Sequence, residues 1–259
     1  MKQNNNNPPK QLLNTTFLFS KDGYQKLPTY LSAMGFSSMS EWDSLFKNLV
    51  YFREKSVEQI EIKKIQELIK NTVARFTNEI ITEPLQVFIF ETKDQFIATE
   101  MGGTSGFCTN KNCIVVLINL QIFTHKELEN TLVHELAHAV NPLYDMGNMS
   151  VGEGIIFEGI AELFRESQVD HEMSKLVSVI PEKEIGTMFK QILPKINSRN
   201  ISDYHELFFG TGKIPRWTGY AIGYWLVKRI LEKQEEIDWS KVLKENPSKF
   251  VNQMVQKYA

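Results

Sequence analysis

The sequence predicts an α+β fold in which a small sheet follows an opening group of helices and precedes a mainly helical second half. Two segments, residues 85–92 and 113–120, are dense in β-branched and other apolar side chains and are typical of buried strands. Apolar residues at spacings of three and four indicate helices before these strands, and only helical patterns follow residue 155. The predicted order is therefore helices, then strands, then helices.

Roughly the first half of the chain contains well-marked helices and strands. Residues 24–80 have a helical pattern, and the glycine-rich segment 101–110 is expected to begin as a loop and end as a strand. The next helix has a capping box formed by Thr124 and Glu127, and it ends near Asn141, which precedes a proline. Its sequence therefore predicts both ends of the helix.

The remainder of the chain is predicted to be loops and helices. Residues 144–154 are interpreted as a loop, followed by a helix from about 155 to 169. Pro181 is typical of a first helical turn, and Gly210 of a helix end. A long helix with aromatic side chains is expected over residues 216–233.

Composition limits the class of protein. The 259 residues are 42% hydrophobic and 23% charged, as in ordinary globular proteins. A net charge of −2 and the lack of a recognition-helix pattern disfavour a DNA-binding regulator. No apolar run approaches the roughly 18–20 residues of a membrane helix. We therefore expect a cytoplasmic protein with neither a nucleic acid nor a membrane as partner.

Three segments are predicted along the chain. Residues 1–20 are interpreted as a disordered leader, because asparagine and proline stand where a secretory signal needs an apolar core. Residues 21–142 form a helical and sheet lobe, and residues 143–259 a helical lobe. Cys108 and Cys113 flank a predicted hairpin turn, and we expect both to be thiols in a cytoplasmic protein.

Two histidines and a glutamate lie inside the helix that ends near residue 141, in the stretch TLVHELAHAV. His134 and His138 are four residues apart, so both imidazoles lie on one helix face, one turn from each other. Glu135 lies beside that face. The H-E-x-x-H pattern is typical of zinc metalloproteases, although by itself it also fits a solvated helix face.

The next helix, with the stretch FEGIAELF, offers the acidic side chains that a metal site would need. A catalytic zinc has three protein ligands and one open position, so Glu158 would complete the set with His134 and His138. Glu162, one turn further, can accept the remaining ring N–H of His134 and fix its tautomer. The apolar residues around both glutamates argue against a solvated acidic stripe. We therefore predict a Zn²⁺ site.

The H-E-x-x-H residues 134–138, followed by Glu158 and an acid four residues later, resemble the gluzincin branch of zinc peptidases, the thermolysin-like clan. With the glycine-rich strand and PRWTGYAIGYWLV, the chain is also similar to a bacterial family of predicted zinc-dependent proteases. The resemblance covers about residues 85–230 and is most specific in the two metal helices. It implies a zincin-like fold, with a small mixed sheet above the metal helix, an edge strand near Ser105–Thr109, and residues 113–120 inside the sheet.

The implied edge strand suggests how a substrate binds. An edge strand has unpaired backbone groups, so an extended peptide or protein substrate can add to it as a further strand. Gly102, Gly103 and Gly106 would allow close backbone approach, or they form only a flexible turn. The identity of the substrate and the oligomeric state are left open by the sequence.

A peptidase also needs a hydrogen-bond donor for the oxyanion that forms during hydrolysis. Tyr220, in the Y-x-x-G stretch that ends at Gly223, resembles a tyrosine with this role in some gluzincin aminopeptidases. Arg216, Tyr224 and His205 are rivals, and an aromatic stripe at helical spacing is more often part of a packed core. The helper histidine of thermolysin-like enzymes has no evident counterpart here.

Together these features predict a zinc metallohydrolase, and specifically a peptidase. Zn²⁺ is expected to be bound by His134, His138 and Glu158, with Glu135 as the general base that takes a proton from the attacking water. The alternative is a non-catalytic zincin-like binding or regulatory module. The presence of Glu135 argues against that alternative, because a purely structural metal site has no use for a base.

Overall fold

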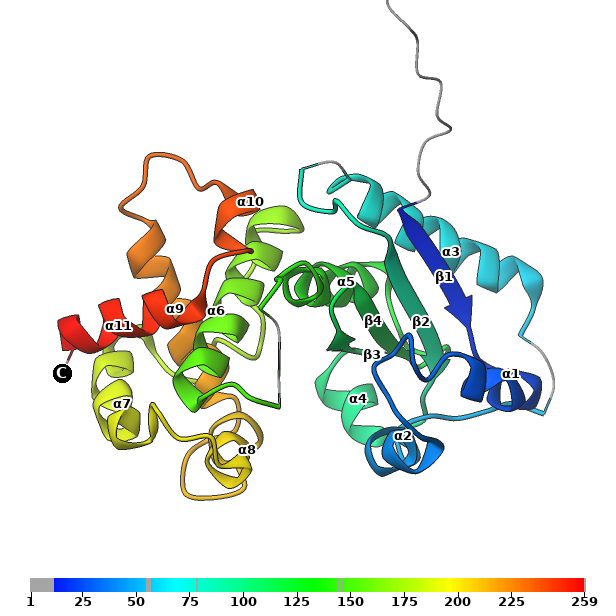
Figure 1. Ribbon diagram of the computed structural model, residues 1–259, viewed down its shortest axis with the longest axis horizontal. Coiled ribbons are helices and arrows are strands. Elements are labelled where there is room, and N and C mark those ends of the chain that lie inside the picture. Colours follow the sequence, from blue (N-terminus) through cyan, green and yellow to red (C-terminus); the bar gives the residue numbers. More distant parts are fainter. Residues whose placement is uncertain (1–11, 55–56, 78, 144, 146, 259) are drawn as a thin grey trace, which may run out of the picture. The chain divides into compact units, whose positions relative to one another are not determined.

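The computed structural model has the predicted α+β architecture (Figure 1). It folds as two compact units, the first ending at Glu129 and the second beginning at Asn130. This division falls inside helix α5, which spans His125–Ala139, whereas the sequence predicts a boundary after residue 142. The structure describes residues 12–54, 57–77, 79–143, 145 and 147–258.

The first unit is built on a four-stranded mixed sheet with the strand order β1-β2-β4-β3. Strands β1, β2 and β4 are parallel, and β3 is antiparallel to β4. β4 lies inside the sheet and is buried along its whole length, while β3 lies at an edge, as expected. The strands are β1 (Leu13–Phe17), β2 (Leu85–Glu91), β3 (Thr104–Asn110) and β4 (Cys113–Ile118).

Strand β1 differs from the sequence prediction, because it lies within residues 1–20, which were interpreted as a disordered leader. It pairs in register with β2, from Leu13 opposite Leu85 to Phe17 opposite Ile89. The segment LNTTF has a weak strand signal of its own, and its pairing partner is distant in the sequence. The first eleven residues of the predicted leader lie outside the described part of the chain.

Helices and aromatic side chains form the core around this sheet. The ring of Trp42 lies 5.8 Å from that of Phe90, and Phe46 lies 5.3 Å from Phe107, so α2 packs on the sheet. The predicted helical region 24–80 is only partly helical, and its longest helix has Ile60 exposed. The helices are α1 (Lys21–Lys26), α2 (Met39–Phe46), α3 (Gln59–Ala74) and α4 (Gln95–Glu100), and sequence analysis missed α4.

The β3–β4 hairpin carries the glycines and cysteines that the sequence analysis considered. Gly102 and Gly103 have φ values of 63° and 85°, so the chain turns through the left-handed region before β3. Cys108 and Cys113 are buried thiols and form no disulfide. Burial raises the pKa of the Cys113 thiol to about 11.

The same unit fixes the first turn of α5. Thr104 Oγ1 donates to the backbone oxygen of Glu127 at 3.1 Å, and Arg75 pairs with Glu129 at 2.8 Å. Thr124 Oγ1 accepts from the backbone N–H of Glu127 at 3.1 Å, which is one half of the predicted capping box. The helix that carries His134 therefore begins at a well-anchored position.

In its described residues the second unit contains helices and no strand. Helices α6 and α9 cross with their backbones in contact at Gly159 and Gly223 (Figure 1). Gly210, with φ 67°, ends α8 as predicted. No helix in the described residues is long and apolar enough to cross a bilayer. The helices are α6 (Val151–Gln168), α7 (Ile185–Ile192), α8 (Ile201–Phe209), α9 (Thr218–Leu231), α10 (Trp239–Val242) and α11 (Pro247–Tyr258).

The start of α6 corrects the predicted loop over residues 144–154. The helix begins at Val151, because Ser150 and Glu153 form a complete capping box with both reciprocal hydrogen bonds. The Ser-x-x-Glu pattern is visible in the sequence and was overlooked. Glu153 also accepts a hydrogen bond from Ser248 at 2.6 Å, so the start of α6 is tied to α11.

Candidate metal centre

Helices α5 and α6 bring His134, His138 and Glu158 together in the second unit. The Nε2 atoms of the two histidines are 3.2 Å apart. Glu158 Oε2 lies 3.1 Å from Nε2 of His134 and 3.4 Å from Nε2 of His138. The three side chains are 6–12% exposed, so the cluster is nearly buried while still reached by solvent.

Local helix geometry places each member of this cluster. The four-residue spacing of His134 and His138 brings both rings to one side of α5, with their centroids 4.9 Å apart. Glu158 faces them from α6, a helix that is buried from Val151 to Arg165 apart from a partly exposed Glu153. The ring of Phe157 packs 6.0 Å from that of His138. The two helices thus hold the ligand atoms in a packed and preorganised setting.

The spacing of these atoms fits a zinc ion. Zinc bonds to nitrogen and oxygen of about 2.0–2.1 Å with tetrahedral angles place neighbouring ligand atoms roughly 3.3 Å apart. The observed separations of 3.1, 3.2 and 3.4 Å form such a triangle. Two imidazoles and one carboxylate are also a donor set found in catalytic zinc sites, with a fourth position for water. The described residues therefore fit the metal both in geometry and in chemistry.

Glu162 sets the protonation of His134. The Nδ1 atom of His134 lies 2.9 Å from Glu162 Oε1, so Nδ1–H donates to this carboxylate and leaves the lone pair of a neutral ring on Nε2. His138 Nε2 and Glu158 Oε2 lie 3.2 Å and 3.1 Å from this His134 Nε2 atom. The three atoms therefore converge on one point, as the ligand atoms of a metal ion would.

The pKa values of His134 and Glu158 reflect the closeness of these groups. Burial lowers the pKa of His134, but hydrogen bonds with Glu158 and Glu162 outweigh it and raise this pKa well above its ordinary value. Burial raises the pKa of Glu158, but the charge and hydrogen bonds of His138 and His134 outweigh it and lower this pKa to about 2. The carboxylate is thus ionised at any physiological pH, as a metal ligand must be.

Glu135 and two tyrosines lie around this cluster. Glu135 is 7% exposed, and its charge raises the pKa of both Tyr204 and Tyr220, after the larger effects of burial and of Glu158. The ring of Tyr220 lies 6.5 Å from the ring of His134. The structure therefore brings the predicted base, the predicted oxyanion donor and the metal residues into one neighbourhood.

Tyr204, on α8, lies near this cluster and was not among the residues predicted from the sequence. Its ring stacks on Phe208 with centroids 4.2 Å apart, and Phe208 in turn contacts Tyr220 edge-on at 5.2 Å. The same ring packs against Gly154 of α6, where an added Cβ would lie only 3.1 Å away. No motif in the sequence marks Tyr204. Only the packing of α8 against α6 and α9 reveals its position.

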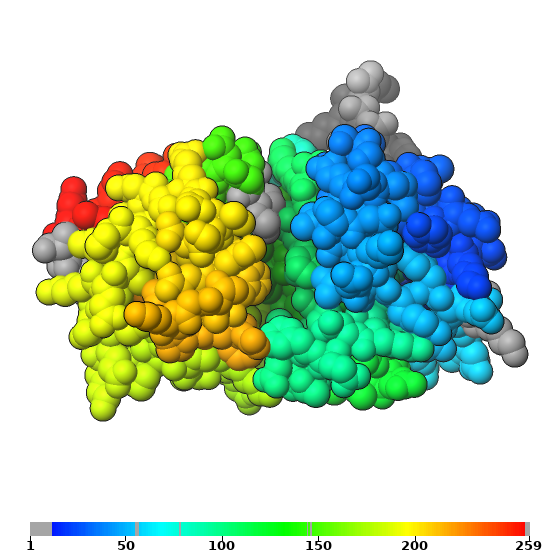
Figure 2. Space-filling view, turned by 90° about the horizontal axis from the view of Figure 1, so that it is seen from below, coloured from blue at the N-terminus to red at the C-terminus, as the bar shows by residue number. Residues whose placement is uncertain are grey.

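The rival donors lie in different surroundings. His205 and Arg216 are exposed, near the surface segment around residues 205–215 that Figure 2 shows in orange. Tyr224 is fully buried, and its hydroxyl accepts a hydrogen bond from Lys228 at 3.0 Å. His125 and His171 are also exposed. Among these candidates Tyr220 is the one with a ring packed near His134.

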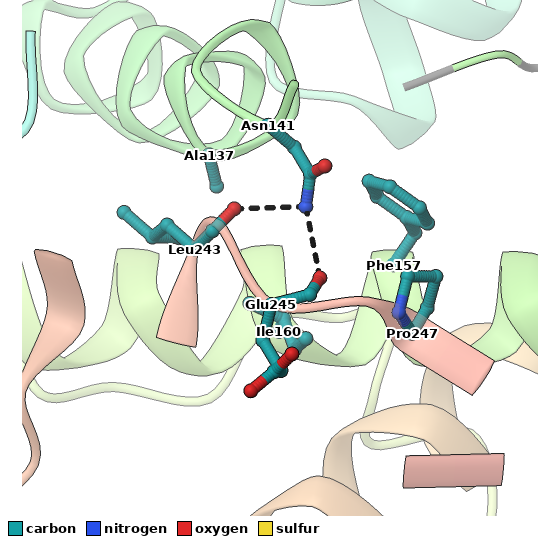
Figure 3. Close-up of a pocket in the computed structure, with 7 residues that line it drawn as sticks. All are labelled: Ala137, Asn141, Phe157, Ile160, Leu243, Glu245 and Pro247. Carbon is teal, nitrogen blue, oxygen red and sulfur yellow. Dashed lines mark hydrogen bonds between the residues drawn. The ribbon is translucent and has the colours of Figure 1, made fainter. Parts of the chain in front are cut away.

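The end of α5 is held by a polar contact beside a small pocket (Figure 3). Asn141 Nδ2 donates to the backbone oxygens of Leu243 at 2.8 Å and Glu245 at 3.3 Å. Asn141 Oδ1 accepts from the backbone N–H of Leu143 at 2.8 Å. These contacts fix the chain three residues after His138, so the metal helix is anchored at both ends.

The chain matches a known protein family over most of its length. Residues 63–252 match the model of the family described as "Predicted Zn-dependent protease (DUF2268)". The matched span is most of the chain and contains the whole cluster of His134, His138, Glu158 and Glu162. No curated protein and no solved structure gives a significant match.

Proposed function

The chain belongs to this family of predicted Zn-dependent proteases, and from that premise we propose that it is a zinc peptidase of the gluzincin type. The observation that carries the proposal is the buried triangle of His134, His138 and Glu158, with Glu135 beside it. A structural zinc site normally uses four protein ligands. Three ligands with a further carboxylate, that of Glu135, beside them support a catalytic site.

Each residue has a distinct role in this proposal. His134, His138 and Glu158 hold Zn²⁺, and Glu162 keeps His134 in the correct tautomer. When bound, zinc supplies Lewis acidity, which acidifies a water molecule and polarises the substrate carbonyl. Glu135 accepts the proton from the attacking water and delivers it to the leaving amine, so that the base is regenerated in each turnover.

Tyr220 donates the hydrogen bond that stabilises the oxyanion. Burial and the nearby carboxylates, above all Glu158, raise the pKa of Tyr220 well above its ordinary value, so its hydroxyl keeps its proton at neutral pH. A protonated donor fixed near the metal residues is what the developing negative charge requires. The Tyr204 hydroxyl has the same property and is the second candidate.

An extended segment of a peptide or protein is the proposed substrate, bound along β3. This strand lies at the edge of the sheet and pairs with β4 alone among the described strands. An edge strand can therefore bind a substrate backbone by strand addition.

The decisive experiment compares the wild-type chain with Glu135→Gln after loading with zinc. We expect the variant to retain one zinc by elemental analysis and to lose about 10²–10⁴-fold in the rate of peptide cleavage, because only the base is removed. Glu129→Gln, on the same helix but paired with Arg75, is the matched control and should cleave at the wild-type rate. An equally active Glu135→Gln enzyme would refute the mechanism. A zinc-loaded wild-type chain that cleaves no peptide would instead favour a binding module.

A further inference from the structure

Glu162 is held on both of its carboxylate oxygens. Oε1 faces the ring nitrogen of His134, as described above. Oε2 accepts a hydrogen bond of 2.6 Å from the hydroxyl of Ser174 and lies 3.5 Å from Nε of Arg165. The carboxylate therefore has a defined orientation, in which Oε1 faces His134 and Oε2 faces Ser174 and Arg165.

Ser174 does not lie on a helix, so another contact must bring it to Glu162. It follows the end of α6, in the 170–174 segment, where the chain reverses through His171 with φ 57°. The reversal is closed by a hydrogen bond of 2.9 Å from the backbone N–H of His171 to the backbone oxygen of Glu166. The segment thus folds back along the helix that carries Glu158 and Glu162.

Arg165 holds this segment in place. Its guanidinium donates to Asp170 Oδ1 at 3.1 Å and to the backbone oxygen of Glu172 at 2.7 Å. A third contact, 3.4 Å, reaches Asn130, which lies one turn before His134 on α5. Arg165 is only 4% exposed. This buried arginine therefore connects its own helix, α6, with α5 and with the 170–172 segment, and its planar guanidinium gives these contacts a fixed geometry.

We propose that Ser174, held by Arg165, is a positioning residue that fixes the Glu162 carboxylate and thereby sets the affinity of the centre for its metal. The inference rests on the metal site of the proposed function and extends it to the 170–174 segment. Without the serine hydroxyl, Glu162 loses the hydrogen bond on Oε2 and rotates more freely about its side-chain bonds. His134 then has a less defined tautomer and ring orientation, and both weaken its binding to the metal.

The test measures zinc affinity by competition with a chromophoric chelator, on the full chain freed of metal. Ser174→Ala should raise the dissociation constant for zinc by about 10-fold, the lower end of the range for groups that support metal ligands. Ser174→Thr keeps the hydroxyl and should restore most of the affinity. Ser178→Ala, in the same stretch but bonded to the backbone oxygen of Lys175, is the matched control and should bind zinc as the wild type does.

A second variant tests the role of Arg165. Arg165→Lys keeps the charge but cannot make all three contacts, so it should weaken zinc binding in the same direction as Ser174→Ala. Because both changes act through Glu162, the double variant should lose less affinity than the two single losses combined. The visible absorption spectrum of the Co²⁺-loaded protein should change in Ser174→Ala, whereas a purely structural defect would lower only the melting temperature.

The outcomes separate this inference from the proposed function. Zinc affinity in Ser174→Ala equal to that of the wild type, with the wild type binding zinc tightly, would overturn the inference alone. A wild-type chain that binds no zinc would overturn both. If Arg165→Lys does not fold, the zinc affinities of Ser174→Ala, Ser174→Thr and Ser178→Ala still test the role of Ser174.

Discussion

Gly159 and Gly223 face each other where α6 and α9 cross, and neither position has room for a side chain. A Cβ atom on either glycine would overlap backbone atoms of the other helix, those of Gly223 in one case and of Ile155 in the other. Glu158 directly precedes the first glycine, and Tyr220 lies three residues before the second. The close crossing therefore sets the separation between a metal residue and the proposed oxyanion donor.

The first prediction concerns this crossing. Gly223→Ala should lower the free energy of unfolding by about 1–3 kcal/mol or more, because the added methyl group must push two packed backbones apart. Gly186→Ala is the matched control, since this glycine lies on α7 with no atom within 4 Å of an added Cβ. The control should gain up to about 1 kcal/mol from better helix propensity. Urea denaturation measures both changes, and equal stability of the two variants would contradict the prediction.

The second prediction concerns pH and the metal. In the metal-free protein, the raised pKa of His134 means that its protonated form stabilises the fold. This contribution is fully present below the unfolded pKa of about 6.5 and is lost as the pH rises through the higher folded value. Glu158, with its pKa lowered to about 2, contributes a constant amount over the same range, because its stabilisation is lost only in strong acid.

Zinc binding reverses this pH dependence of stability, because zinc binds neutral imidazole and must displace the proton from the histidine ring. We therefore expect the rise in melting temperature on adding zinc to be small near about pH 5.5 and larger near about pH 7.5. Thermal unfolding with and without zinc at both pH values measures it. His125→Asn, which removes an exposed histidine from the same helix, should leave the effect unchanged. A zinc-induced rise that is greatest at the lower pH would be incompatible with these ligands.

The cluster of His134, His138 and Glu158 was predictable because its signals are local. His134 and His138 share a helix face by spacing alone, and so do Glu158 and Glu162 one helix later. Strand β1 was missed because its weak apolar pattern is stabilised by pairing with β2, far along the chain. The start of α6 could have been found from its capping box.

Two further parts of the centre depend on tertiary packing. Tyr204 reaches the centre only because α8 packs against α6 at Gly154. Ser174 reaches Glu162 only because Arg165 binds the chain that follows α6.

The third prediction decides which tyrosine stabilises the oxyanion. The ring of Tyr220 packs near that of His134. The rings of Tyr204 and Tyr220 both contact the ring of Phe208. Tyr220→Phe should lower kcat by about 10²–10³-fold with zinc retained and KM little changed, because the hydroxyl acts only on the charge that develops in the transition state. Tyr204→Phe should act mainly on KM, by less than about 10-fold, because we expect its hydroxyl to contact the bound substrate equally before and during the reaction.

Tyr224→Phe is the control for this comparison. It removes a buried hydroxyl from the same helix as Tyr220, but one that is bonded to Lys228, so kcat and KM should both stay at wild-type values. Steady-state kinetics on one peptide substrate measures all three variants, and elemental analysis checks their zinc. A loss of kcat in Tyr204→Phe that Tyr220→Phe lacks would transfer the oxyanion role to Tyr204. Unchanged kcat in both would mean that neither hydroxyl stabilises the oxyanion, so its charge would have to be balanced without a tyrosine.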